Sequence, residues 1–182
     1  MENRKIIRFL SEINQQSANA LISVIEDLIR QDQKDILLLI SSQGGSVFHG
    51  ISLYNFLKRA PIHLDTCNFG SVDSIATVIY CAGAKRYCVP DTRFLIHSIN
   101  FNIQGNISFE EKQLNEIISG LRLDRENVAK IIAENCNKTT EEIEDIMFKG
   151  KVYNPEEAKS FGLVTEITEC LFKEGEKIIG IG

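Results

Sequence analysis

An uninterrupted apolar run, Ile36–Ile40, is the feature that most constrains the fold of this chain. Polar residues bound the run, with Asp35 before it and Ser41 after it, so it has the length of a strand rather than of a helix. A strand without polar positions is typical of a parallel sheet, because such a sheet is covered on both faces. We therefore expect an α/β protein that contains this run as a buried strand.

The rest of the chain alternates between strand-like and helix-like patterns. Strand-like runs lie at residues 5–10, 62–69, 85–89, 93–97 and 163–167. Helix-like patterns lie at residues 17–30, 48–58, 75–81, 108–134 and 154–162, and a further capping sequence begins at Thr139. This alternation predicts helices that cross over between parallel strands, and the length of 182 residues fits one domain, residues 1–182.

Charge and cysteine content exclude several classes of function. The formal net charge is −5 and the basic residues are scattered, so we expect no nucleic-acid partner. The five cysteines are widely spaced and contain no C-x-x-C pair, so we expect no metal and no cofactor. Reduced thiols fit a cytoplasmic location, and no apolar run is long enough to cross a membrane.

Two sequences stand where expected strands end. Gly44-Gly45 follows the buried run, and adjacent glycines let a backbone approach a ligand closely. Ser74 follows a strand-like run that we expect to end at Gly70, and a helix-like run begins at Ile75. Because active sites of parallel sheets lie beyond the carboxyl ends of the strands, we expect these sequences to lie close together. A phosphate cradle is the competing interpretation, and the sequence does not favour it, since no G-K-[ST] sequence follows the glycines.

Ser74 and His97 are the candidate catalytic pair. A serine at a strand-to-helix turn presents its hydroxyl where helix N–H groups stabilise negative charge, and His97 ends a strand from which it can act as the base. In the alternative interpretation Ser74 is a helix cap and His97 is a histidine at a strand end.

The segment 98–105 alternates polar and apolar residues and predicts a hairpin or flap. A long helix follows, at about residues 107–135, with a capping box at Ser108. Since such a helix spans nearly 40 Å, we expect part of it to project and to contact another subunit. The tail, residues 170–182, stays unassigned between a final strand and a disordered end.

Six motifs together resemble a known family over about residues 6–167. They are Ser42-x-Gly44-Gly45-Ser46-Val47, Gly70-x-x-x-Ser74, Ala82-Gly83-Ala84-Lys85-Arg86-Tyr87-Cys88-x-Pro90, Arg93-x-x-Ile96-His97, Gln104-Gly105 and Glu157-Ala158-x-x-Phe161-Gly162-Leu163-Val164. In order and spacing they resemble the proteolytic subunit of the Clp protease. The resemblance implies that the chain is a serine endopeptidase of the crotonase-like superfamily. It also implies a ClpP-like fold of repeated ββα units with a projecting handle helix.

The resemblance also implies roles for individual residues. Ser74 attacks the peptide carbonyl and His97 takes its proton, while the backbone N–H groups of Gly45 and Ile75 form the oxyanion hole. The edge that includes Asn100, Phe101 and Asn102 binds the polypeptide substrate as an added strand. The handle joins homo-oligomeric, heptameric rings, in one or two layers, around a proteolytic chamber.

The chain departs from the family pattern in two ways. The catalytic aspartate of the family falls on Gly150, and its loss can cost about 10⁴ in rate. The substitutes are Glu144 or Asp145, Asp91, and Asp73, the last being least suited because it adjoins the serine. The chain also begins almost at its first strand, without the family's N-terminal axial segment, which makes a Clp ATPase partner doubtful.

Three functions therefore stay open. The first is a Clp-type serine peptidase that works with a Ser-His pair and an atypical or missing third member. The second is a catalytically weak or inactive homologue that serves as a structural or regulatory ring subunit. The third is a crotonase-like enzyme that acts on an acyl-thioester and needs no serine nucleophile.

Overall fold

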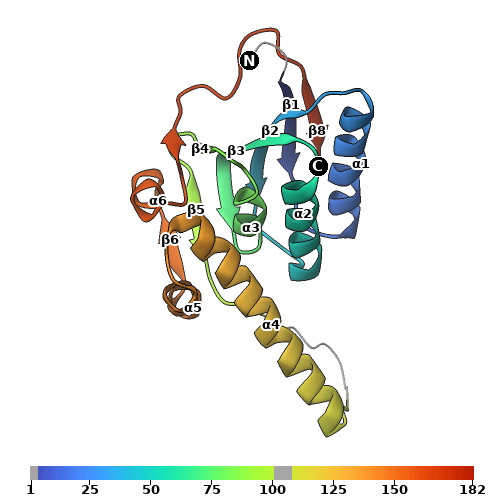
Figure 1. Ribbon diagram of the computed structural model, residues 1–182. Coiled ribbons are helices and arrows are strands. Elements are labelled where there is room, and N and C mark those ends of the chain that lie inside the picture. Colours follow the sequence, from blue (N-terminus) through green and yellow to red (C-terminus); the bar gives the residue numbers. More distant parts are fainter. Residues whose placement is uncertain (1–3, 101–107) are drawn as a thin grey trace.

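The computed structural model describes residues 4–100 and 108–182, which form one sheet and its covering helices (Figure 1). The strands are β1 (Lys5–Leu10), β2 (Asp35–Ser42), β3 (His63–Asp73), β4 (Arg86–Cys88), β5 (Arg93–Ile96), β6 (Lys151–Tyr153), β7 (Glu166–Ile167) and β8 (Ile178–Ile181). The helices are α1 (Gln15–Arg30), α2 (Val47–Arg59), α3 (Ala76–Tyr80), α4 (Glu111–Cys136), α5 (Thr140–Lys149) and α6 (Pro155–Phe161).

The sheet has the strand order β6-β5-β3-β2-β1-β8, with β4 beside β3 and β7 beside β4. All strand pairs are parallel except β5 with β6. The expected α/β fold with a largely parallel sheet is confirmed. The antiparallel strand β6 was not expected, because its three residues are too few to give a pattern.

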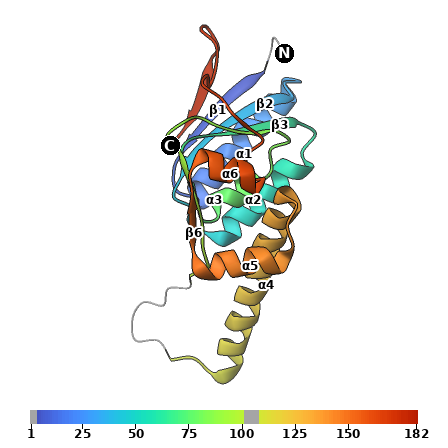
Figure 2. The ribbon, with the colours of Figure 1, turned by 90° about the vertical axis from the view of Figure 1, so that its left-hand side faces the viewer.

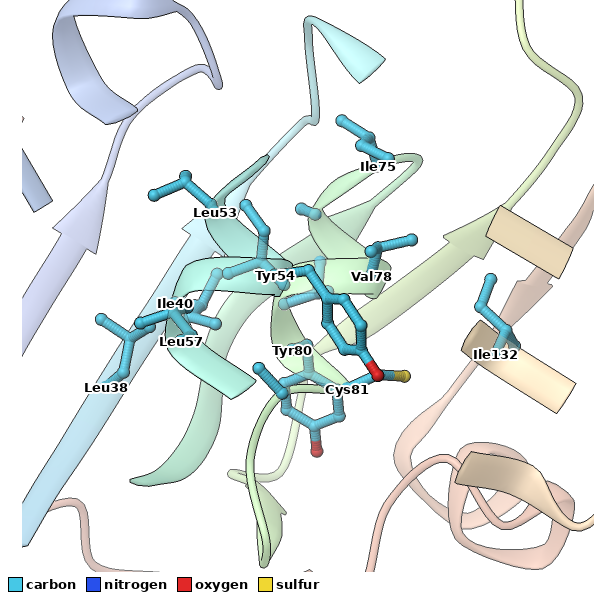
Figure 3. Packing of buried hydrophobic residues seen from close by; sticks show 14 of the residues in the cluster. Leu38, Ile40, Leu53, Tyr54, Leu57, Ile75, Val78, Tyr80, Cys81 and Ile132 are labelled. Atoms are coloured by element: carbon cyan, nitrogen blue, oxygen red, sulfur yellow. The ribbon is translucent and has the colours of Figure 1, made fainter. Parts of the chain in front are cut away.

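The run Ile36–Ile40 lies in β2, between β1 and β3, and is buried along its whole length. Leu38 and Ile40 point into the main core, where they pack against α2 and α3 (Figure 3). Leu37 and Leu39 point to the opposite face and form a smaller apolar cluster with Ile6 and Cys67. Burial on both faces explains why the strand carries no polar residue in this run.

Strand β3 continues through Gly70 to Asp73, three residues beyond its expected end. Residues 66–68 pair with β4, and residues 71–73 pair with β5. A Cβ atom on Gly70 would lie 2.6 Å from Oγ of Ser41. The glycine accommodates this close approach between neighbouring strands, and it does not mark the end of β3.

Helix α4 projects from the body of the molecule, as expected for the handle (Figures 1 and 2). It begins later than predicted, because its N-cap is Glu110 and not Ser108. The N–H group of Glu110 donates to Oε1 of Gln113 at 3.0 Å, as in a capping box. It ends at Cys136, where Asn137 has a φ of +53°. The buried residues of α4 all lie in its C-terminal third, whereas Leu114, Ile118 and Leu123 are exposed.

The tail forms strand β8, which pairs with β1 from Ile6↔Ile178 to Phe9↔Ile181. Before β8, the guanidinium of Arg4 contacts the Glu176 carboxylate at 3.4 Å and holds the tail to the start of β1. The open question about the tail is thus settled in favour of a final strand. Among the described residues, no helix is both long enough and apolar enough to cross a bilayer.

Candidate active site

The Gly44-Gly45 loop after β2 and the Ser74-Ile75 turn after β3 lie directly against each other. A Cβ atom on Gly44 would lie 2.8 Å from Cβ of Ser74 and 3.4 Å from the backbone N of Ile75. Gly44 also has a φ of +93°, which side chains rarely permit. The proximity expected from the carboxyl ends of neighbouring strands is therefore present.

Backbone contacts hold the loop in place. The Ile13 N–H donates to the Gly44 carbonyl at 2.8 Å, and the Ser46 N–H donates to the Ile13 carbonyl at 2.8 Å. A Cβ atom on Gly45 would lie 2.3 Å from the Ile13 oxygen, and one on Gly50 in α2 would lie 2.2 Å from Cγ1 of Ile75. Three neighbouring glycines thus let the loop, the turn and α2 approach one another closely.

Ser74 has a backbone conformation that is uncommon for serine. Its φ is +59°, its N–H donates to the Leu95 carbonyl at 2.8 Å, and its carbonyl accepts from Thr77 at 3.0 Å. The N-cap of α3 is Ile75, so Ser74 is not the helix cap of the alternative interpretation. A non-glycine residue at positive φ costs about 1–2 kcal/mol, and such strain concentrates at functional sites.

The backbone N–H groups of Gly45 and Ile75 are the candidate oxyanion hole. Within residues 4–100 and 108–182, neither N–H donates a hydrogen bond to a protein acceptor. Ile75 is buried whereas Gly45 is exposed, and their two N–H groups belong to the turn and the loop that are in contact. Free N–H groups beside a serine can bind a developing oxyanion.

His97 directly follows β5 and lines the same small cavity as Ser74. The cavity has a volume of only about 10 Å³. Its other lining residues are apolar: Val47, Ile75, Ile96, Ile99, Val128, Ile132 and Met147. Among the described residues the Ser74 hydroxyl and the His97 ring have no hydrogen bond to each other, so the pair is near but not engaged in this conformation.

Gly150, the C-cap of α5, lies beside the histidine. A Cβ atom on Gly150 would lie 3.9 Å from Cβ of His97, and apart from the adjoining residues of the chain no other described atom lies within 4 Å of it. The position at which the sequence lacks a carboxylate is therefore open space next to the imidazole.

Three of the four carboxylates considered as substitutes have other partners. Asp73 pairs with Arg93 at 2.7 Å, Glu144 with Arg125 at 3.0 Å, and Asp145 with Lys149 at 2.6 Å. Asp91 lies exposed on the turn before β5. In the part of the chain that the structure describes, no carboxylate lines the cavity of Ser74 and His97.

The remaining expected residues are divided between described and undescribed parts. Asn100 is exposed after β5, whereas Phe101 and Asn102 lie outside the described residues.

No group of three or more metal-ligating side chains occurs among the residues described. All five cysteines are free, and burial raises the pKa of the Cys67 thiol to about 12 and that of Cys136 to about 11.

A second cavity, which the sequence analysis did not anticipate, adjoins the two glycines. It has a volume of about 550 Å³ and lies where β1, β2 and β3 end. Its lining is formed by Leu10, Ser11, Glu12, Ser41, Ser42, Gln43, Gly44, Gly45 and Ser71. The available signal was the cluster of serines after three apolar strands, which points to a polar surface at their carboxyl ends.

Two comparisons with known proteins are informative. The family model described as Clp protease matches residues 1–170 of the chain. Among solved structures, a mutant of ClpP1 from Listeria monocytogenes is similar, with a TM-score of 0.82 and 25% sequence identity. The match covers 92% of each of the two chains.

Proposed function

Since the chain belongs to the Clp protease family, we propose that it is a serine endopeptidase that cleaves polypeptides inside an oligomeric chamber. The family assigns a ClpP-type peptidase, and the proposal adds the serine chemistry and the residues that perform it. One observation carries it: Ser74, at a φ of +59°, stands against the Gly44-Gly45 loop and shares a cavity with His97.

The chemistry follows from this arrangement. His97 takes the proton of the Ser74 hydroxyl as its oxygen attacks the carbonyl carbon of the scissile peptide bond. The carbonyl oxygen becomes an oxyanion, which the N–H groups of Gly45 and Ile75 bind. The tetrahedral intermediate breaks its C–N bond, and His97 gives the proton to the leaving amine. Water, activated by His97, then hydrolyses the ester on Ser74.

For this step the Ser74 hydroxyl and the His97 ring must approach to hydrogen-bond distance. Such bonds are often long or absent in unliganded enzymes and form with the substrate. The cavity between them is only about 10 Å³, so the apolar residues around it must shift by a small amount. We expect assembly or substrate to supply that shift.

The proposed peptidase works with a dyad, because no carboxylate from residues 4–100 or 108–182 lines the cavity of the imidazole. A third group holds the correct tautomer and stabilises the imidazolium, and without it a triad enzyme loses about 10⁴ in rate. Gly150 leaves room for such a group beside His97. We therefore expect slow turnover compared with relatives that carry an aspartate.

The proposal includes assembly through α4. Leu114, Ile118 and Leu123 are exposed on this helix, which projects beyond the body (Figure 2). Apolar side chains on a projecting helix favour packing against another copy. We propose heptameric rings, and we place the substrate strand along the edge that begins at Asn100.

Covalent labelling tests the proposal. Intact protein is treated with a serine-directed fluorophosphonate and weighed by mass spectrometry, with Ser74→Ala and His97→Ala as comparison variants. Size-exclusion chromatography and circular dichroism establish that each sample is folded and assembled. We expect the wild type to gain one label and both variants to gain none.

An inactive ring subunit is the second candidate, and the absent Ser74–His97 hydrogen bond favours it. A folded, assembled wild type that takes up no label would support this candidate and reject the peptidase. Labelling at Ser74 would instead count against both the inactive subunit and an enzyme acting on acyl-thioesters, since the latter needs no serine nucleophile.

A further inference from the structure

The cavity of about 550 Å³ at the ends of β1, β2 and β3 has no role in the proposed mechanism. Its size lies within the range of ligand-binding pockets. The Gly44-Gly45 loop and the segment that contains Ser11 and Glu12 both line it, and the two are neighbours, since Ile13 forms a β-bridge with Gly45. The cavity is therefore built on the same loop that carries half of the candidate oxyanion hole.

The two glycines of that loop face in different directions. A Cβ atom on Gly44 would meet Ser74, whereas a Cβ atom on Gly45 would meet the Ile13 carbonyl and Cγ of Glu12, the latter at 3.0 Å. The loop thus has the candidate nucleophile on one side and the Glu12 side chain on the other. A polypeptide whose carbonyl binds the Gly45 N–H lies within reach of both.

The lining of this cavity combines polar groups with apolar surface that includes Leu10, and it has one charged residue. Oγ of Ser42 accepts from the Gly44 N–H at 3.1 Å, and Oγ of Ser41 accepts from the Ser71 N–H at 3.3 Å. Both hydroxyl hydrogens remain available to a ligand in the described structure. Glu12 is the single charged lining residue, and its carboxylate forms no hydrogen bond or ion pair with any described residue.

These features differ from those of the cavity that holds Ser74 and His97. That cavity is small and lined mainly by apolar residues, whereas the one beside Glu12 is wide, partly polar and has a negative charge. An unpaired carboxylate among hydroxyl groups favours an ammonium or guanidinium group, which can bind the carboxylate and several oxygens together. A carboxylate side chain would meet repulsion from Glu12.

We propose that this cavity is a substrate subsite that takes a lysine or arginine side chain of the polypeptide close to the bond that is cleaved. The proposal rests on the proposed function, because it assumes a peptide held at the Gly44-Gly45 loop. Glu12 is then a residue that determines specificity and takes no part in the chemical step.

Binding can be measured without cleavage. Fluorescein-labelled hexapeptides that differ at one position, as lysine, norleucine or glutamate, are titrated with assembled Ser74→Ala protein, and the varied position is moved along the peptide. We expect lysine to bind about two- to fivefold more tightly than norleucine at one position, the range of an exposed ion pair. Glutamate should bind most weakly there.

Three variants in the Ser74→Ala background complete the test. Glu12→Gln should remove the lysine preference, and Glu12→Lys should reverse it in favour of glutamate. Glu26→Gln, which changes an exposed glutamate of α1, should leave it intact. The same preference in all three variants, or no peptide binding at all, would overturn the subsite. The proposed function is decided separately, by fluorophosphonate labelling of the wild type.

Discussion

Two polar regions of this molecule, the surroundings of Arg86 and the Ser74 turn, use hydrogen-bonding groups in opposite ways. Both are packed against the main core, and both join segments that are distant in the sequence. In the first, every donor has a partner, whereas in the second several groups have none. The difference separates polar groups that hold the fold together from polar groups that are available for chemistry.

The Arg86 side chain is buried, with 8% of its surface exposed. Nε donates to the Leu163 carbonyl at 2.8 Å, and Nη1 donates to the Gly83 carbonyl and to Oδ1 of Asn135. Nη2 donates to the carbonyls of Asn135 and Gly162 at 2.9 and 3.2 Å. All five N–H groups are therefore used, and their acceptors lie at the ends of α3, α4 and α6, where helix carbonyls favour a cation.

The Ser74 turn leaves its polar groups open. The N–H groups of Gly45 and Ile75, the Ser74 hydroxyl and the His97 ring have no partner among the described residues. The neighbouring Asp73 has one carboxylate oxygen bonded to Arg93 and the other, Oδ1, buried without a partner. Since buried polar groups are nearly always paired, the unpaired Asp73 oxygen is unusual, whereas the partly exposed Ser74 and His97 side chains are available to bond a ligand.

Replacement of Arg86 should have the largest effect on stability. Arg86→Met leaves buried carbonyls of three helix ends without donors, and we expect a loss of about 3–5 kcal/mol in the free energy of unfolding. Urea denaturation followed by circular dichroism measures it. Arg86→Lys keeps the charge but not the fork of donors, so it should lie between wild type and Arg86→Met. A loss below about 1 kcal/mol for Arg86→Met would contradict the structural role.

Alkaline pH should weaken the Arg86 region next. Burial raises the pKa of Cys136 to about 11, although Arg86 and Lys138 oppose the shift, so the folded state holds the thiol proton more tightly than the unfolded state. The contribution of this thiol to the free energy of unfolding is complete below pH 9 and is lost as pH rises toward 11. At pH 10.5 the loss is about 2 kcal/mol. The free energy of unfolding should fall less steeply with pH in Cys136→Ala than in wild type, and equal slopes would contradict the role of this thiol.

Gly150→Asp should sharpen the site by giving His97 a partner. The new carboxylate stands in open space beside the histidine, and we expect the rate of fluorophosphonate labelling to rise at least tenfold, or about 1.4 kcal/mol. The φ of +70° makes any side chain strained, so stability should fall by about 1–2 kcal/mol.

Gly150→Ala is the matched control for this change, because it adds the same backbone strain without a carboxylate. Gly150→Ala should lose the same free energy of unfolding, and its rate of fluorophosphonate labelling should not rise. Equal labelling rates in both variants would show that the open position beside His97 has no bearing on the reactivity of Ser74.

Ser74→Gly should have the smallest effect on stability, and of the opposite sign. Glycine adopts a φ of +59° without strain, so relief of the strained turn should raise the free energy of unfolding by about 0.5–1 kcal/mol while labelling is lost. Ser74→Ala keeps the strain and should unfold like wild type within about 0.5 kcal/mol. A destabilised Ser74→Gly would mean that the serine belongs to the structure, as Arg86 does.

Much of the fold could be predicted from short-range patterns. The apolar run in β2, the paired glycines after it and the capping sequences of the helices are local signals, and they placed the main elements within a few residues. Parallel topology then implied that Gly44 and Ser74 lie close together, which is how the structure arranges them. The proposed roles of Ser74, His97, Gly45 and Ile75 stay predictions.

The errors arose where a residue is explained by a distant contact. Gly70 was interpreted as the end of a strand, although it accommodates Ser41 of the neighbouring strand. Strand β6 was missed because it is too short to be recognised without its partner β5, and for the same reason the tail that contains β8 was left between two alternatives. The positive φ of Ser74 and the wide cavity beside Glu12 depend on how several segments meet, and no single segment carries a signal for them.

The pairing of β8 with β1 has a consequence for the order of folding. The register Ile6↔Ile178 joins residues separated by nearly the whole chain, so the entropy of closing a very long loop must be overcome before these hydrogen bonds form. Strand pairs of such high contact order form late, and during synthesis the free edge of β1 must wait for residues 178–181. Until then that edge can pair with another nascent chain, which makes β1 a site of possible misassembly during synthesis.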